Sequence, residues 1–140
     1  MPRVSAAFFL TGGLCVLAGM LWGIHMGASE DMATMPAHAH LNLLGWVTMA
    51  LYGTFYALTA KTLSKRLAWT NYVLSLVGVA VLIPSLALFL IGRNPALIPV
   101  MGAGEILSVL ALLVFLVSAV RELVRRRAVG EETVLRMAAE

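Results

Sequence analysis

The sequence predicts an all-α integral membrane protein, a bundle of four transmembrane helices. Hydrophobic residues make up 61% of the 140 residues, whereas soluble domains average about 45–50%. The mean hydropathy is +0.92, so there is too little polar surface to cover a globule. At roughly 20 residues per crossing, the apolar runs predict helices near residues 4–27, 38–60, 67–91 and 97–120. They form one domain, residues 1–127, and residues 128–140 form a cytoplasmic tail.

The first apolar run follows Arg3, as the hydrophobic core of a signal peptide would. It is longer than the usual core of roughly 7–15 residues, and no Ala-x-Ala site closes it, so we expect a retained helix. Gly19, Gly23 and Gly27 recur every four residues and form a ridge of small residues along one face. Such a ridge lets another helix approach closely in lipid, from the same chain or from a second subunit.

Each of the other runs is bounded by residues that begin or end a helix. Pro36 suits the first turn of the second helix, where a missing N–H costs nothing. Trp69 fits the interfacial aromatic belt at the start of the third helix. A Gly-Arg-Asn-Pro turn at 92–95 precedes the fourth helix, which contains Glu105, an acid inside an apolar run.

The basic residues predict the orientation of the chain. With four crossings, Arg93 is the one basic residue on the side of Glu30 and Asp31; the other side collects Arg3, Lys61, Lys65, Arg66, Arg121, Arg125, Arg126, Arg127 and Arg136. Because cytoplasmic loops carry an excess of Lys and Arg, we expect both termini in the cytoplasm and the protein in the inner membrane of a bacterium. These residues flank apolar runs. We therefore expect the lipid bilayer as a partner and no nucleic acid, despite the net charge of +3.

Two of the three histidines, His38 and His40, stand at the start of the second apolar run. Imidazoles are costly in hydrocarbon and therefore suggest a function. Successive residues of a helix turn by about 100°, so these two point about 200° apart and can serve sites on opposite faces. Imidazole is a common ligand of haem iron, zinc and copper. The alternative is a pair of interfacial histidines satisfied by water, headgroups or backbone.

The stretch His-Ala-His-Leu-Asn-Leu-Leu-Gly-Trp at 38–46 resembles the His-Ala-His-Leu segment in the tenth helix of the catalytic subunit of the haem–copper oxidase superfamily. Nitric oxide reductases and C-family cytochrome oxidases are the most similar members. In that family the first histidine ligates the high-spin haem and the second the low-spin haem, towards the outer side of the membrane. The resemblance implies that His38 and His40 bind b-type haem for electron transfer, gas binding or haem handling.

Family subunits have at least twelve helices in three four-helix arcs, and they carry further histidines for copper. The resemblance therefore implies that this chain corresponds to one arc and forms a homo-oligomer, with a trimer favoured. His38 of one subunit and His40 of the next would then flank each of three pores. A single chain lacks the full oxidase ligand set, so enzymatic activity stays open; any activity would be that of an oxidoreductase.

Three further residues are candidates for supporting roles. His25 lies at the outer end of the first helix and is a possible third ligand, a partner of a haem propionate or an interfacial residue. Glu105 is a possible proton relay, or a partner of His25 or Arg93. Asn42 follows the pair by two residues and is expected to hydrogen-bond between helices.

Two alternatives to haem follow from the same region. Thioether sulfur and imidazole together suit Cu(I), and Met20, Met26, Met32 and Met35 lie near the histidines in sequence. The chain would then be a copper-binding or copper-handling membrane protein. It would otherwise be a cofactor-free assembly partner of a respiratory complex. Cys15 is alone in an apolar run and is expected to act as a small buried hydrophobe.

Overall fold

The computed structural model describes the backbone of residues 1–139 and the side chains of residues 1–125. Every regular element in that part of the chain is helical, which confirms the all-α prediction. The elements are α1 (Arg3–Ser29), α2 (Met35–His40), the π-helix η1 (Leu41–Thr48), α3 (Met49–Leu58), α4 (Lys65–Gly92), the 3₁₀ turn η2 (Pro95–Leu97) and α5 (Ile98–Ala139).

Four stretches of the described chain are long and apolar enough to cross a membrane: Arg3–Ser29, Met35–Leu58, Lys65–Gly92 and Pro95–Arg125. The second of these, called the second span below, consists of α2, η1 and α3. A chain in hydrocarbon must satisfy its backbone N–H and C=O groups internally, and continuous helices do so. These are the properties of a multi-pass membrane protein.

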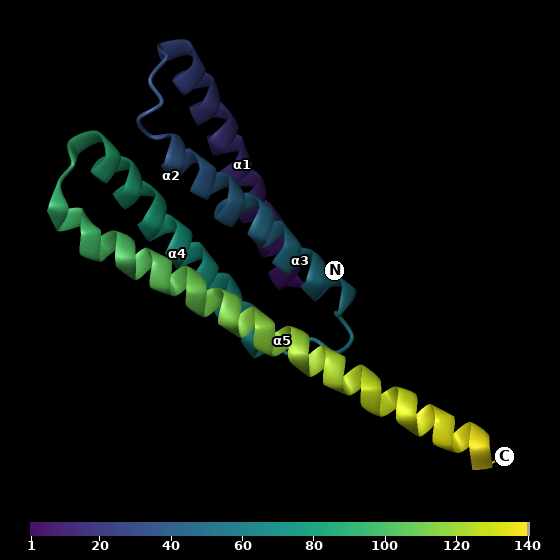
Figure 1. Cartoon of the computed structure of the whole chain (residues 1–140). Coiled ribbons are helices and arrows are strands. Elements are labelled where there is room, and N and C mark those ends of the chain that lie inside the picture. The colour runs from purple at the N-terminus through teal and green to yellow at the C-terminus, as the bar shows by residue number, and fades with distance from the viewer. Residues whose placement is uncertain (140) are drawn as a thin grey trace.

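The fourth helix departs from its expected end near residue 120, because α5 continues to Ala139. The residues that follow Val120 are rich in Arg, Glu, Leu and Ala, which favour helices. Glu122 and Arg125 add an ion pair of 2.8 Å between neighbouring turns. The backbone of the expected tail is therefore helical to residue 139, while its side chains lie outside the described residues (Figure 1).

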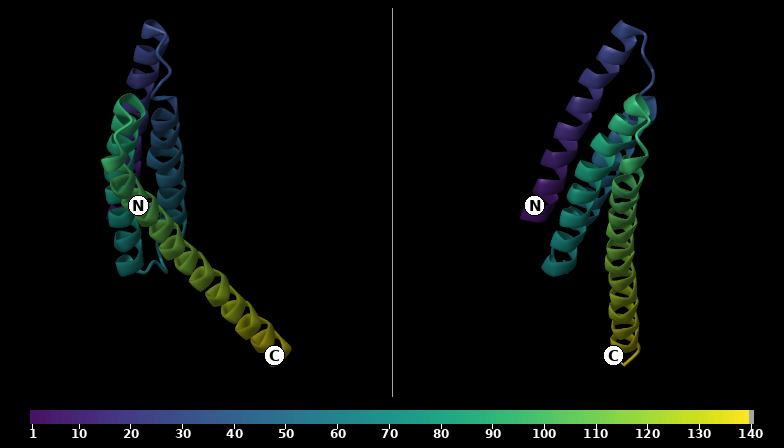
Figure 2. Two further views of the ribbon diagram at one scale, coloured as in Figure 1. Left: turned by 60° about the vertical axis from the view of Figure 1, so that its left-hand side comes forward. Right: turned by 90° about the vertical axis from the view of Figure 1, so that its left-hand side faces the viewer.

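The spans form two antiparallel hairpins that lie side by side (Figures 1 and 2). One hairpin pairs α1 with the second span, and the other pairs α4 with α5. The N-terminus and the turn at 59–64 lie at one end of the bundle, called the basic end below. The turns at 30–34 and 93–97 lie at the other, called the histidine end below because His25, His38 and His40 are near it.

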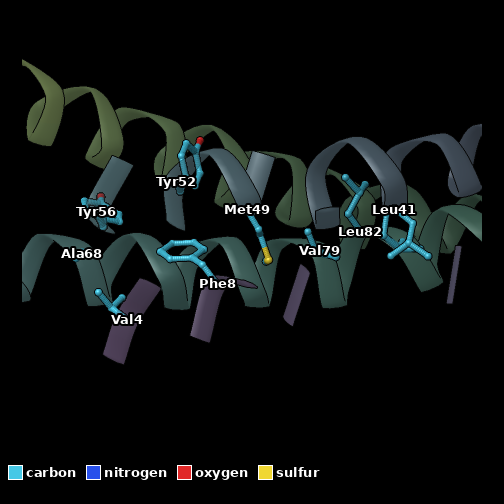
Figure 3. Close-up of a cluster of buried hydrophobic side chains, with 10 residues drawn as sticks. Val4, Phe8, Leu41, Met49, Tyr52, Tyr56, Ala68, Val79 and Leu82 are labelled. Atoms are coloured by element: carbon cyan, nitrogen blue, oxygen red, sulfur yellow. The ribbon is translucent and has the colours of Figure 1, made fainter. Parts of the chain in front are cut away.

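The core lies where α1, the second span and α4 meet. Its buried side chains are Val4, Phe8, Leu41, Met49, Tyr52, Tyr56, Ala68, Val79, Leu82 and Ile83. Figure 3 shows them in a row, with Tyr56 and Val4 at one end and Leu41 at the other. Phe8 is fully buried, and its ring lies 5.1 Å from that of Tyr72 and 5.9 Å from those of Tyr52 and Tyr56. These aromatic contacts join the first hairpin to α4 of the second.

Buried polar groups connect the helices near the basic end. The Asn71 amide donates to the Tyr56 hydroxyl at 3.0 Å and accepts from the Ser75 hydroxyl at 3.1 Å. The Tyr56 hydroxyl in turn donates to Ser118 of α5 at 3.3 Å. Because an unpaired polar group in hydrocarbon costs several kcal/mol, this chain of bonds fixes how α3, α4 and α5 are aligned.

Candidate functional site

The second span changes its helical geometry immediately after the histidine pair. His38 and His40 belong to the regular helix α2, whereas Leu41–Thr48 form the π-helix η1. The predicted helix over residues 38–60 is therefore not a regular α-helix along its whole length. π-Helical turns are rare and frequently occur at functional sites. The two histidines nevertheless point to different surroundings, as expected for α2.

His38 faces α1 and is half-buried. Its ring packs over Gly23, where an added Cβ would lie 3.3 Å from its Cε1 atom, and it meets the Trp22 ring edge-on at 6.3 Å. Its Nε2 lies 3.1 Å from the Asn42 Nδ2 amide group, which donates to it. The expected bond from Asn42 to another helix is therefore made within its own span, while the Asn42 side chain packs against Gly19 of α1.

The ridge of small residues on α1 thus receives the polar side chains of the second span. Gly19 contacts Asn42, Gly23 contacts His38, and Gly27 has open space beside it. The ridge serves packing within the chain at two of its three positions. His38 Nδ1 and Asn42 Oδ1 are both buried without a hydrogen-bond partner among the described residues. Such groups typically cost about 1–3 kcal/mol each. The two polar side chains therefore lower the stability of the packing between α1 and the second span.

His40 faces away from α1 and is exposed on the surface of the chain. Its Nδ1 lies 2.7 Å from the carbonyl oxygen of Pro36, one turn earlier, and donates to it. The other ring nitrogen, Nε2, then carries the lone pair and has no partner among the described residues. A histidine ligand of a metal is commonly oriented by this kind of bond from its second nitrogen.

A groove of about 260 Å³ lies between the second span, α4 and α5. It is called the second–fourth groove here and is lined by Leu44, Thr48, Tyr52, Ser75, Val79, Ser108, Val109, Ala111 and Leu112. Leu44, Thr48 and Tyr52 repeat every four residues, and His40 continues this row by one turn. Glu105 stands one turn before Val109 in α5, and neither His40 nor Glu105 lines the groove.

Glu105 is exposed although it lies within the span Pro95–Arg125. Its expected partners, His25 and Arg93, are exposed as well, and no ion pair joins them in the described part of the chain. No hydrogen bond or ring contact joins His25 to His38 among the described residues. The backbone carbonyl of His25 accepts from the Ser29 hydroxyl at 2.8 Å. A carboxyl in an apolar span normally faces other protein or a water-filled cavity, whereas Glu105 is left uncovered by the single chain.

The methionines considered as copper ligands differ in burial. Met20, Met32 and Met35 are exposed, and the buried Met26 accepts a hydrogen bond of 3.6 Å from Thr34. Among the described residues, no three His, Cys, Asp or Glu side chains form a group that could hold a metal ion. Cys15 is half-buried against Gly45 of η1. His25 and His40 are both exposed, and the ring of His40 is oriented by its bond to the Pro36 carbonyl.

Two further features of the residue spacing predict which side chains share a helix face. Asn42 follows His38 by four residues, so the two side chains share one face of a helix and can bond to each other. His40, Leu44, Thr48 and Tyr52 share another face by the same rule. What spacing could not provide is the second wall of the groove, which α5 supplies from a segment more than fifty residues away.

Substituting Gly19 with alanine tests the contact between α1 and Asn42. The added methyl group has no room beside the Asn42 amide, so we expect the bond to His38 to break. Overpacking typically costs about 1–3 kcal/mol, partly offset by the higher helix propensity of alanine, so the expected net loss of unfolding free energy is about 1 kcal/mol. Reversible unfolding in mixed detergent micelles measures it.

Gly27→Ala is the matched control for this substitution, since it lies on the same ridge and has nothing within 4 Å. It is expected to be neutral or slightly stabilising. Equal effects of the two substitutions would show that the Gly19–Asn42 contact does not determine the packing of α1.

In comparisons with known proteins, the chain matches no family model, no curated protein and no solved structure. The class that the fold defines is a four-span, all-helical membrane protein with an outward-facing imidazole near one end.

Proposed function

We propose that this chain binds a b-type haem in the membrane near the histidine end, with His40 as an axial ligand. The observation that carries the proposal is the state of the His40 ring. It is exposed at the level of an apolar span, its Nδ1 is held by Pro36, and its Nε2 is left to coordinate. The haem would supply an iron centre able to take up an electron or bind a small gas.

The second–fourth groove, which begins one helical turn beyond His40 in sequence, fits part of such a group. Leu44, Val109 and Leu112 give the second–fourth groove apolar walls, which suit a flat macrocycle and exclude water. At about 260 Å³ the groove is smaller than the roughly 300–1,000 Å³ of typical ligand pockets. One chain would therefore cover only part of the haem, and a neighbouring copy would cover the rest.

His38 is the second proposed ligand, on the condition that its ring leaves its present contacts. Its Nε2 is occupied by Asn42 and its Nδ1 is buried against α1. To coordinate the iron held by His40 of a neighbouring subunit, the His38 ring would have to leave Asn42. The two histidines therefore have unequal proposed roles. His40 is required for haem binding, whereas His38 at most completes the coordination of the iron. His25 is left as a surface residue near the same end.

A homo-oligomer is part of the proposal, and a trimer is favoured because of the resemblance to a three-arc scaffold. Two features of the single chain support an assembly. Glu105 and His40 are both exposed within apolar spans, where ionisable groups are costly. The fourth span is also the least covered, with 11% of its most apolar window buried. A second copy packed against the fourth span would cover Glu105.

Purification in mild detergent after expression with added haem tests the proposal. We expect a Soret band, a pyridine haemochrome spectrum of haem b, and a native mass that is a multiple of the chain. The absence of a Soret band after haem supply, or a strict monomer, would contradict it. Metal analysis of a colourless preparation then separates a copper protein from a cofactor-free assembly partner.

A further inference from the structure

A second cavity, of about 410 Å³, lies at the basic end of the bundle. It is called the basic-end pocket here and is lined by Phe55, Tyr56, Thr59, Thr62, Leu63, Ser64, Leu67, Ser118, Val120, Arg121, Glu122, Val124 and Arg125. The end of α3, the turn at 59–64, the first turn of α4 and the last membrane-spanning turns of α5 form its walls. It is at the opposite end of the bundle from His40 and plays no part in the proposed haem site.

The lining of this pocket combines two kinds of surface. Phe55, Leu67 and Val124 contribute apolar walls, while hydroxyl groups such as those of Thr59 and Ser64 lie beside them. The pocket sits where the apolar spans end, which is the level at which a lipid passes from acyl chains to headgroup. Its lining therefore suits an amphiphile that is oriented like the surrounding lipid.

The charges around the pocket are strongly unequal. Arg121 and Arg125 line it, and Lys61, Lys65 and Arg66 flank its turn in sequence. The acid in its lining, Glu122, is held by Arg125 at 2.8 Å and by the Thr62 hydroxyl at 2.7 Å.

Arg121 is the cation that this arrangement leaves available. It is exposed and has no ion pair within the described part of the chain. A guanidinium donates to phosphate oxygens through a planar fork of N–H groups, which makes arginine a preferred ligand of phosphate.

We propose that the basic-end pocket binds one anionic phospholipid, with the phosphate at Arg121 and one acyl chain along the apolar wall of Phe55, Leu67 and Val124. Basic pockets between transmembrane helices commonly hold anionic headgroups. The occupant is a lipid because the apolar lining has no use in binding free phosphate. The site is independent of haem, so it would remain if the proposed function failed.

Native mass spectrometry of the purified protein tests this site, with equal amounts of phosphatidylglycerol and phosphatidylcholine of the same acyl chains. We expect one phosphatidylglycerol retained per chain in preference to phosphatidylcholine. Arg121→Gln should weaken that retention about fivefold, the effect of roughly 1 kcal/mol per basic residue near anionic lipid. Arg121→Lys keeps the charge and should restore most of it.

Arg3→Gln is the matched control, because Arg3 is an exposed basic residue at the same end and does not line the pocket. We expect it to leave lipid retention unchanged. Equal retention of the two lipids, or an equal loss in Arg3→Gln and Arg121→Gln, would overturn the proposal, since the attraction would then be diffuse.

Discussion

The His40→Ala variant is expected to lose haem altogether, with its Soret band at background after haem supply. The reason is that His40 offers an imidazole nitrogen outside the chain, while its other nitrogen is fixed by the Pro36 carbonyl at 2.7 Å. Without this ring, the second–fourth groove retains apolar walls but no ligand for iron. The pyridine haemochrome assay, expressed as haem per chain, measures the loss.

Leu43→Ala provides the control, because Leu43 is also exposed, at 59%, and lies three residues further along the same span. It should retain the wild-type haem content. His38→Ala should keep haem bound, and its unfolding free energy should fall, since the side chain packs on Gly23. Full haem content in His40→Ala, or loss in His38→Ala alone, would show that the inward-facing ring is the ligand.

Gly104→Ala is expected to cause the largest loss of stability among single methyl additions to the described helices. An added Cβ would lie 2.7–2.8 Å from the backbone N and Cα of Leu82, so α4 and α5 would have to move apart. The backbone atoms of Leu82 cannot rotate away from the added methyl group, as the atoms of a side chain can. Overpacking costs up to about 3 kcal/mol, alanine returns about 1 kcal/mol of helix propensity, and the expected net loss is about 2 kcal/mol.

The measurement is the unfolding free energy in mixed micelles, with Gly102→Ala as the control. Gly102 lies half a turn away on the same helix and has nothing within 4 Å of an added Cβ. Its substitution should be neutral or stabilising by up to about 1 kcal/mol. If both variants unfolded alike, the close approach of α4 and α5 would not hold the second hairpin together.

Much of the fold could be predicted because hydrophobic length in lipid leaves few alternatives. The expected starts at residues 4, 38, 67 and 97 each lie one to three residues after the starts of the spans at Arg3, Met35, Lys65 and Pro95. The end of the fourth helix could not be predicted in this way. Once a helix leaves the apolar layer, charged helix formers extend it as readily as leucine does, so hydropathy does not mark where it stops.

The candidate site was predicted in part. Helical spacing alone correctly placed His38 and His40 on different faces, because about 100° per residue holds within α2. Helical spacing did not show which of the two faces packs against another helix. Asn42 and the ridge of small residues on α1 enclose His38, and this depends on how α1 packs against the second span.

By itself, the sequence determined the helical class, the four apolar spans and the gathering of basic residues at one end, because each depends on local composition and on the thickness of a bilayer. Tertiary structure decided which histidine is available, how Glu105 is exposed, and where α5 closes a groove beside the second span. These features join residues far apart in the chain. They depend on the close packing of glycine against a partner helix, which no periodicity within one helix can specify.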